Sequence, residues 1–370
     1  MTAVHSPGKV LVTGANGYIG MWIVRILLEQ GYIVRGAVRS QSKGKYLTRY
    51  FQQMGFGADK LEIVVVDDLT KQGAFDQAVQ GVDAVQHVAA PVDIEVSNPQ
   101  GITVLPYPQA DATKSKLPDF MKPAVQGTVG ILRSALEHGN NIRRIILTSS
   151  CAAVMSVPKV HTVFTEDDWN TESIEDVEVN GSHAKPESAY LASKTIAERA
   201  AWEFWEKHKR EIKWDLVAID PSVVFGPCIH EITHGPTNLN ASLKWLYDTV
   251  VNTSSQPDWF LRYPFAWVDV RDVALGHVLS LQREAAGGER IIMSNASFVF
   301  HDLVGVAKKI KPFPLRNHPP PKAIEGLEAL RLVEFKTEKQ EKILGMNKEG
   351  MKTIEETVKD SLEEFANRGW

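Results

Sequence analysis

The chain has 370 residues, of which 44% are hydrophobic and 23% charged, and its formal net charge is −4. This composition is typical of a globular protein with one large domain or two closely packed domains. No strongly basic balance points to nucleic acid, so we expect no such partner. We expect no signal peptide and no membrane association, because no apolar stretch approaches the roughly 20 residues of a transmembrane helix. The only cysteines are Cys151 and Cys228, which favours a reduced, cytoplasmic setting.

The chain before Ser222 alternates short apolar runs with helical patterns. The runs that predict strands are 9–13, 32–38, 61–66, 82–89, 143–148 and 215–219. The helical patterns are 19–30, 43–54, 75–79, 118–138 and 188–208. Strands that alternate with helices predict an α/β fold, a Rossmann-like doubly wound parallel sheet.

The pattern changes after Ser222, where helical segments outnumber strands. We interpret residues 1–222 as a Rossmann-like, dinucleotide-binding domain and 223–370 as a smaller substrate lobe, with parts near 267–293 returning to the first domain. A terminal amphipathic helix is expected at 353–366. An insertion at 91–117 follows the fourth strand on the ligand side, and forms either a lid over the substrate or a passive surface excursion.

Three glycines follow the first predicted strand, in the run TGANGYIG from Thr13 to Gly20. Glycines permit a tight turn and let a pyrophosphate approach the backbone, while the next helix presents its N-terminal N–H groups to the negative charge. A strand before the loop and an amphipathic helix after it are the context that such a site needs. The loop predicts a dinucleotide site, the alternative being an ordinary strand–helix turn.

The end of the second strand indicates which dinucleotide is bound. An NAD site usually has Asp or Glu there, whereas this chain has Arg39 and, soon after, Lys43. A guanidinium pairs with the 2′-phosphate of NADP, which a carboxylate would repel. NADP is therefore favoured over NAD. The alternative is that both cations are solvated surface charges.

Tyr190 and Lys194 form a Y-x-x-x-K motif on a predicted helix, so they share one face, one turn apart. A phenol is a poor acid at neutral pH, but a nearby ammonium ion stabilises the phenolate and makes proton donation easier. Ser150 ends the fifth predicted strand, at the edge where doubly wound sheets bind ligands. The three residues predict a catalytic group that acts on a substrate oxygen, the alternative being a structural Tyr and Lys near a strand-end turn.

With these motifs the chain resembles the extended short-chain dehydrogenases/reductases. The branch it resembles contains dihydroflavonol 4-reductases and fungal NADPH-dependent aldehyde and ketone reductases. Further shared landmarks are 38–40 (VRS), 87–89 (HVA), 123–128 (PAVQGT), 221–227 (PSVVFGP) and 268–272 (VDVRD). The resemblance implies reduction of an aldehyde or ketone to an alcohol by NADPH. Ser150 would position the carbonyl, Tyr190 would donate the proton, and Lys194 would bind the nicotinamide ribose.

The resemblance also implies the contacts of the cofactor. The glycine loop would hold the pyrophosphate, Arg39 and Lys43 the 2′-phosphate, and the segment after the third strand the adenine. The residues expected to contact NADPH are Gly14, Ala15, Asn16, Gly17, Tyr18, Ile19, Arg39, Lys43, Asp68, Leu69, Ala89, Tyr190, Lys194, Pro221 and Val223. Cys151 and Val223 replace residues common in these relatives, so we expect both to line a substrate pocket of different shape.

The segment from His230 to His234 matches the H-E-x-x-H pattern of zinc metalloproteases. That pattern needs a helix that presents both histidines on one face. Pro227 and Pro236 bracket the segment, so we expect a loop beside the substrate cleft and no metal.

Other functions remain open on the residues alone. The same fold serves NAD(P)-dependent hydroxyl dehydrogenases, such as those of hydroxysteroids, and sugar-nucleotide epimerases. A non-catalytic, dinucleotide-sensing regulatory protein would not need Ser150, Tyr190 and Lys194. The leading hypothesis is a monomeric or homodimeric enzyme with a small-molecule carbonyl substrate.

Overall fold

Seven parallel strands form the centre of the molecule in a computed structural model, which describes residues 3–90, 121–251, 256–321 and 330–370. The strands are β1 (Lys9–Thr13), β2 (Ile33–Val38), β3 (Leu61–Val65), β4 (Ala84–His87), β5 (Arg144–Thr148), β7 (Asp215–Pro221) and β10 (Arg290–Met293). Their order in space is β10-β7-β5-β4-β1-β2-β3, so the direction of winding reverses between β1 and β4. Open α/β sheets bind ligands at such a point. The prediction of a Rossmann-like doubly wound sheet is confirmed.

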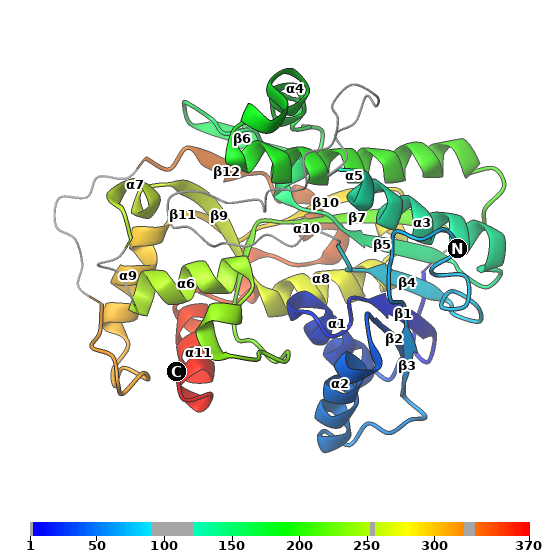
Figure 1. Ribbon diagram of the computed structural model, residues 1–370, viewed down its shortest axis with the longest axis horizontal. Coiled ribbons are helices and arrows are strands. Elements are labelled where there is room, and N and C mark those ends of the chain that lie inside the picture. The colour runs from blue at the N-terminus through cyan, green and yellow to red at the C-terminus, as the bar shows by residue number, and fades with distance from the viewer. Residues whose placement is uncertain (1–2, 91–120, 252–255, 322–329) are drawn as a thin grey trace.

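Helices cover both faces of this sheet (Figure 1). On one face α3 (Lys122–His138) packs against α5 (Pro186–His208), and on the other α1 (Tyr18–Glu29) packs against α8 (Val270–Gln282). The strands read as continuous apolar runs because both faces are buried. The helix α2 (Gln41–Gln53) follows β2, and α4 (Thr171–Asn180) packs against α5.

The remaining elements form two smaller sheets and their helices. One sheet joins β8 (Val223–Phe225), β9 (Pro264–Asp269) and β11 (Ala296–Val299), and the other joins β6 (Thr162–Phe164) and β12 (Val333–Phe335). The helices are α6 (Ala241–Val251), α7 (Asp258–Leu261), α9 (Phe300–Lys309), α10 (Glu338–Leu344) and α11 (Ile354–Asn367). The expected terminal helix is α11, whose N-cap is Thr353. The division into domains at residue 222 stays a prediction.

The sequence interpretation was wrong for residues 75–79, which form turns instead of a helix. Gly73 and Gly81 flank this segment with φ of 73° and 69°, a backbone conformation that ends helices. The segment between these two glycines is too short to form a stable helix. The insertion 91–117, expected to be a lid or a surface excursion, lies outside the described residues.

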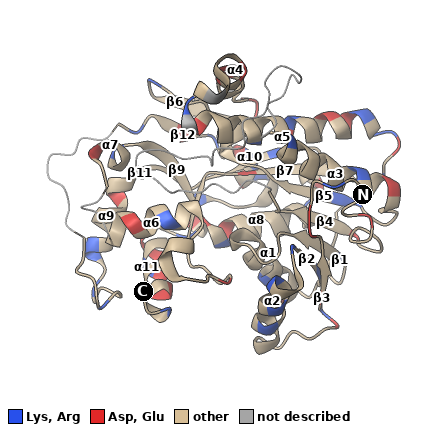
Figure 2. Cartoon of the chain, viewed as in Figure 1, with Lys and Arg blue, Asp and Glu red and all other residues tan. Residues whose placement is uncertain are grey.

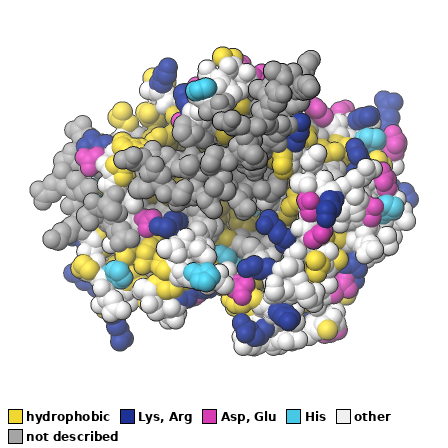
Figure 3. Space-filling model, viewed as in Figure 1, with side chains coloured by type: hydrophobic (Ala, Val, Ile, Leu, Met, Phe, Trp, Pro, Cys, Tyr) yellow, Lys and Arg dark blue, Asp and Glu magenta, His cyan; other side chains and the backbone are white. Residues whose placement is uncertain are grey.

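Charged side chains of both signs are spread over the molecule. Blue and red segments occur on many parts of the chain in Figure 2, and the two signs are interspersed on the face shown in Figure 3. Within the described ranges, no helix combines the length and the apolar character that crossing a bilayer requires.

Candidate active site

The glycine loop between β1 and α1 is shaped by close contacts that only glycine allows. Gly14 has φ of 62°, and a Cβ there would lie 3.0 Å from the backbone nitrogen of Ala89 at the end of β4. A Cβ on Gly20 would lie 2.1 Å from the carbonyl oxygen of Gly14. Gly17 is the N-cap of α1, so the first N–H groups of the helix face this loop. The loop therefore fits a pyrophosphate, as the sequence predicts.

Thr13 fixes the end of β4 beside this loop. Its Oγ1 accepts hydrogen bonds from the N–H groups of Val88 and Ala89, each at 3.1 Å, and lies 3.0 Å from Nδ1 of His87. Burial, and then the charge of Lys194, lower the pKa of His87 to about 3, so this ring is neutral at neutral pH. Lys194 and Ala89, which follows β4, line the same small cavity.

Positive charge surrounds the end of β2, where the 2′-phosphate of NADP is expected. Arg39 is exposed directly after β2, and α2 carries Lys43, Lys45 and Arg49 but no acidic residue (Figure 2). The Nζ of Lys43 also forms an ion pair with Glu231 at 3.2 Å. The residues fit a 2′-phosphate, with Arg39 as the more accessible cation and Lys43 shared with Glu231.

The segment expected to contact adenine follows β3. The carboxylate of Asp68 accepts hydrogen bonds from the Thr70 hydroxyl at 2.6 Å and the Thr70 N–H at 2.9 Å, and these bonds lower the pKa of Asp68. Leu69 packs against α3, where a Cβ on Gly127 would lie 2.2 Å from its Cδ1. Both residues are held in place at the same sheet edge as the glycine loop.

A cavity of about 20 Å³ brings the catalytic elements together at the ends of β4 and β5. Its lining comes from these two strand ends and from α3 and α5. The lining residues are Ala89, Ala90, Ala124, Thr128, Leu147, Thr148, Ser149, Ser193, Lys194, Ala197 and Glu198. The lysine of the Y-x-x-x-K motif and the strand end that precedes Ser150 therefore share one site.

Ser150 begins the short helix η1 (Cys151–Ala153), which packs against α5. Its Oγ accepts a hydrogen bond from the N–H of Ala152 at 3.1 Å, so the hydroxyl hydrogen is free to donate to another oxygen. Tyr190 and Lys194 are both partly exposed, one turn apart on α5. The sequence-predicted serine, tyrosine and lysine thus come from two elements that touch.

The sequence interpretation missed three ionisable side chains beside this group. Glu198, one turn after Lys194, accepts hydrogen bonds from Oγ of Ser149 at 2.5 Å and from Nε of Arg290 at 2.6 Å. Asp220, in β7, lies 3.9 Å from the same Arg290 nitrogen. Burial and the nearby charge of Glu198 raise the pKa of Asp220 well above its usual value.

Two sequence signals could have found this cluster. Glu198 continues the four-residue spacing of Tyr190 and Lys194 along one helix face. Asp220 directly follows the apolar run 215–219 that predicts a strand, and β7 includes it. An acidic side chain within a buried strand needs a polar or charged partner. Arg290 gave no local signal, because its partners lie far away in the chain.

The expected nicotinamide contacts lie at the same edge of the sheet. Pro221 ends β7 and is buried, whereas Val223 begins β8 and is partly exposed. Cys151, expected to line the substrate pocket, is only 4% exposed, and its Sγ donates a hydrogen bond to the carbonyl oxygen of Asp220. Burial raises the pKa of Cys151 well above its usual value and that of Cys228 to about 11, which disfavours thiolate chemistry at both.

The segment from His230 to His234 is a loop, as expected. His234 has the left-handed φ of 66°, and the His230 ring lies 5.5 Å from the ring of Tyr18. Burial lowers the pKa of His230 to about 3. Neighbouring residues of this loop are tied to α1, where the Tyr18 hydroxyl and the Trp22 indole donate to the carbonyl oxygens of Gly226 and Pro227, each at 2.9 Å.

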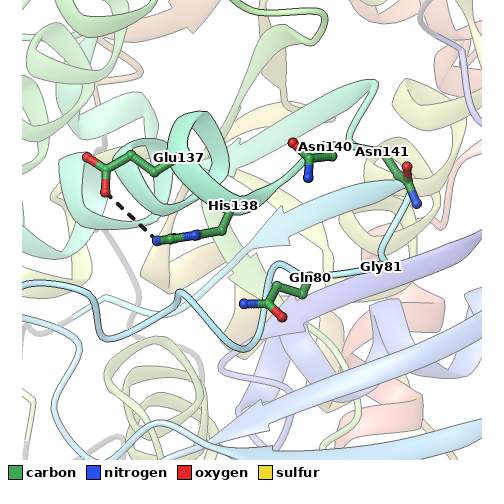
Figure 4. Close-up of a pocket in the computed structure, with 6 residues that line it drawn as sticks. All are labelled: Gln80, Gly81, Glu137, His138, Asn140 and Asn141. Atoms are coloured by element: carbon green, nitrogen blue, oxygen red, sulfur yellow. Dashed lines mark ion pairs between the residues drawn. The ribbon is translucent and has the colours of Figure 1, made fainter.

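A larger surface hollow of about 320 Å³ lies away from this site (Figure 4). Its side chains come from the end of α3 and from the turns that precede β4 and β5. The lining residues are Gln80, Gly81, Glu137, His138, Asn140 and Asn141. It therefore opens at the amino-terminal edge of the sheet, opposite the glycine loop and Ser150.

Known proteins share both the sequence and the fold of this chain. The model of the NAD dependent epimerase/dehydratase family matches residues 10–294. The chain belongs to this family. The prediction of an extended short-chain dehydrogenase/reductase is therefore confirmed.

Several relatives match over nearly their whole length. A ketoreductase of Aspergillus niger is 31% identical over 360 residues, which are 96% of this chain and 98% of the relative. The NADPH-dependent methylglyoxal reductase of Saccharomyces cerevisiae is 32% identical and covers the same shares of both chains. Among solved structures, the yeast methylglyoxal/isovaleraldehyde reductase complexed with NADPH has a TM-score of 0.79 and 29% identity, over 98% of this chain and 99% of that chain.

Proposed function

We propose that this chain is an NADPH-dependent reductase of aldehydes or ketones, with Ser150, Tyr190 and Lys194 as its catalytic residues. One observation carries the proposal: the Ser150 turn packs against the helix that bears Tyr190 and Lys194, at the sheet edge that also holds the glycine loop. The reductases among its relatives, which are similar over nearly their whole length, support the same activity.

The side chains supply the proton and the orientation for reduction. When bound, NADPH supplies the hydride that forms the new C–H bond at the carbonyl carbon. The Ser150 hydroxyl donates a hydrogen bond to the carbonyl oxygen and so fixes its position. Tyr190 gives its phenolic proton to this oxygen, which becomes the alcohol, and the positive charge of Lys194 stabilises the phenolate that remains.

The expected cofactor contacts follow the same edge of the sheet. The backbone from Gly14 to Ile19 would hold the pyrophosphate, Arg39 and Lys43 the 2′-phosphate, Asp68 and Leu69 the adenine, with Ala89 beside the glycine loop. Pro221 and Val223 would flank the nicotinamide, and Val223 with Cys151 would shape the substrate pocket. These positions support NADP over NAD because Arg39 directly follows β2 and the helix α2 carries basic residues and no acidic one.

A hydroxyl dehydrogenase or a sugar-nucleotide epimerase is the nearest rival, because the family description includes epimerases. Arg39 favours NADP, which cells keep mainly reduced, and so supports reduction over either rival. A dinucleotide sensor without catalysis would have no use for the three catalytic side chains. We further propose that the enzyme works in the cytoplasm, because both cysteines are free thiols. We also propose that it acts as a monomer or homodimer.

Consumption of NADPH and NADH with a panel of aldehydes and ketones tests the proposal. We expect turnover with NADPH and a clear preference over NADH, and a preference for NADH would contradict the role of Arg39. Tyr190→Phe should lower kcat by about 100-fold or more while NADPH still binds. Tyr247→Phe is the matched control, because Tyr247, on α6, packs against Phe365 of α11 and belongs to none of the elements that carry Ser150, Tyr190 or Lys194. Unchanged turnover of Tyr190→Phe would refute the assigned acid.

A further inference from the structure

The carboxylate of Glu198 uses both of its oxygens inside the protein, where it is 1% exposed. Its Oε2 accepts the hydrogen bond from Oγ of Ser149 at 2.5 Å. Its Oε1 accepts from Nε of Arg290 at 2.6 Å and from Nε1 of Trp202 at 3.1 Å. Three donors, one of them a guanidinium, therefore hold this carboxyl group in place.

Asp220 is fully buried beside this carboxylate, and neither of its oxygens has a hydrogen-bond partner among the described residues. The Nε of Arg290 lies 3.9 Å from Asp220 but donates to Glu198 at 2.6 Å. Burial, and then the charge of Glu198, raise the pKa of Asp220 well above its usual value. A buried carboxyl group without donors, next to a second carboxyl group, favours its neutral form, so we infer that Asp220 carries a proton.

This cluster joins the two elements that carry the catalytic residues. Ser149 immediately precedes Ser150, and its N–H donates to the carbonyl oxygen of Ile219 at 2.8 Å, so both its backbone and its side chain are fixed. Glu198 is one turn from Lys194 on the same face of α5. A single carboxylate therefore connects the strand end that bears Ser150 with the helix that bears the acid.

We propose that Glu198 is a positioning residue for carbonyl reduction: its carboxylate holds Ser149, and with it the Ser150 turn, against α5. The inference rests on the proposed reductase function and deepens it. Glu198 does not contact the substrate in this role. Glu198 acts on the reaction through the placement of Ser150 relative to Tyr190.

Glu198→Gln tests the positioning role. The amide cannot accept from Ser149 with the strength of a carboxylate, so kcat for carbonyl reduction should fall about tenfold. The dissociation constant for NADPH should stay within about twofold, because the glycine loop and Arg39 are not touched, and a loss of folded protein would instead lower the number of NADPH sites. The matched control is Glu203→Gln, the same change at an exposed position of α5, which should leave both constants unaltered. A folded Glu198→Gln with the wild-type kcat would overturn the proposal.

Ser149→Ala removes the donor of the same hydrogen bond. This variant tests the positioning role of Glu198 if Glu198→Gln does not fold. We expect a fall in kcat of about threefold to tenfold with unchanged NADPH binding. In the double variant the two effects should not multiply, since each breaks the same bond. Fully multiplicative effects, or a Ser149→Ala variant as active as wild type, would show that Glu198 does not act through Ser149.

The proton on Asp220 has a direct signature. The infrared spectrum at neutral pH should contain the carbonyl stretch of a protonated carboxyl group, and Asp220→Asn should remove it. Absence of that band in the wild type would overturn the protonated state of Asp220. These failures differ from failure of the proposed function, in which the wild type itself would reduce no carbonyl compound. An inactive Tyr190→Phe beside a fully active Glu198→Gln would reject the positioning role alone.

Discussion

Two buried arginines in the central sheet differ in how completely each is paired with a carboxylate. Arg144, at the start of β5, donates to both carboxylate oxygens of Asp215, from Nε at 2.6 Å and from Nη2 at 2.7 Å, and its Nη1 donates to the carbonyl oxygen of Ser280. Arg290 donates a single hydrogen bond to Glu198, from Nε, and its guanidinium stacks on Trp169, 3.6 Å from the ring centroid. Its Nη2 has no hydrogen-bond partner in the part of the chain that the structure describes.

The difference follows the position of each pair relative to the ligand edge. The Arg144 pair lies at the amino-terminal edge, where α8 ends, and its forked geometry serves to hold strands and helix together. The Arg290 cluster lies next to Ser149 and leaves polar atoms of Asp220 without donors. An unsatisfied buried polar atom costs free energy, so natural proteins keep few of them. The contrast indicates that one pair stabilises the fold and that the other supports the catalytic turn.

The largest expected effect breaks the complete pair. Asp215→Asn removes the charge that faces Arg144 and leaves a buried guanidinium unbalanced, which should lower the free energy of unfolding by about 3 to 5 kcal/mol. Urea unfolding at neutral pH measures the loss, and kcat per folded molecule should stay at the wild-type value. A loss below about 1 kcal/mol would contradict the claim that the Arg144–Asp215 pair stabilises the fold.

Acid should weaken the molecule through three buried histidines. Burial lowers the pKa of His87, His230 and His277 to about 3, below the usual value of 6.5. The unfolded chain therefore binds more protons than the folded chain between these values, and the unfolding free energy falls as the pH drops from about 6.5 towards 3. We expect a loss of about 2 kcal/mol or more over this window in urea titrations, smaller for His277→Gln. A free energy independent of pH would contradict neutral buried rings.

A surface cap gives a reference effect outside both regions. Glu356 accepts hydrogen bonds from the N–H and the hydroxyl of Thr353 at the start of α11, and the N–H bond, with the help of Lys352, lowers its pKa to about 2. Glu356→Ala should cost about 1 kcal/mol at neutral pH. Because a depressed acid pKa stabilises the fold above the unfolded value, the difference from wild type should vanish as the pH falls from about 4.5 to 2. Thermal unfolding at several pH values checks this, and a constant difference would contradict the cap.

The smallest expected effect distinguishes the two aspartates. Asp220→Asn replaces a protonated, uncharged carboxyl group with an uncharged amide of similar shape, so the unfolding free energy should change by less than about 1 kcal/mol. The same substitution at Asp215 is the matched comparison under identical urea conditions. Equal losses at the two positions would mean that Asp220 is ionised like its counterpart.

The residues that could be predicted from the sequence belong to motifs that are short and contiguous. The glycine loop and the Tyr190–Lys194 pair each lie within one turn or one helix, so their spacing alone places them. Ser150 was found because a buried strand ends just before it, and parallel strands carry their ligands at that edge.

What the sequence could not supply depends on contacts between distant segments. Arg290, Glu198 and Asp220 come from β10, α5 and β7, and only the order of strands in the sheet brings them together. The prediction of a helix at 75–79 was wrong for a different reason. Two flanking glycines adopt positive φ angles, which the surrounding turns determine and the local sequence pattern does not show. Local pattern therefore defines the reacting groups, and tertiary packing defines what holds them.

Isotope transfer tests the central claim most directly. NADPH that carries deuterium at both positions of the nicotinamide C4 is incubated with a ketone that the enzyme reduces, and the product alcohol is examined by mass spectrometry and NMR. We predict one deuterium on the carbinol carbon of each product molecule formed by the wild type, and almost no product from Tyr190→Phe. Alcohol without deuterium, or labelled alcohol formed at the normal rate by Tyr190→Phe, would contradict hydride reduction with Tyr190 as the acid.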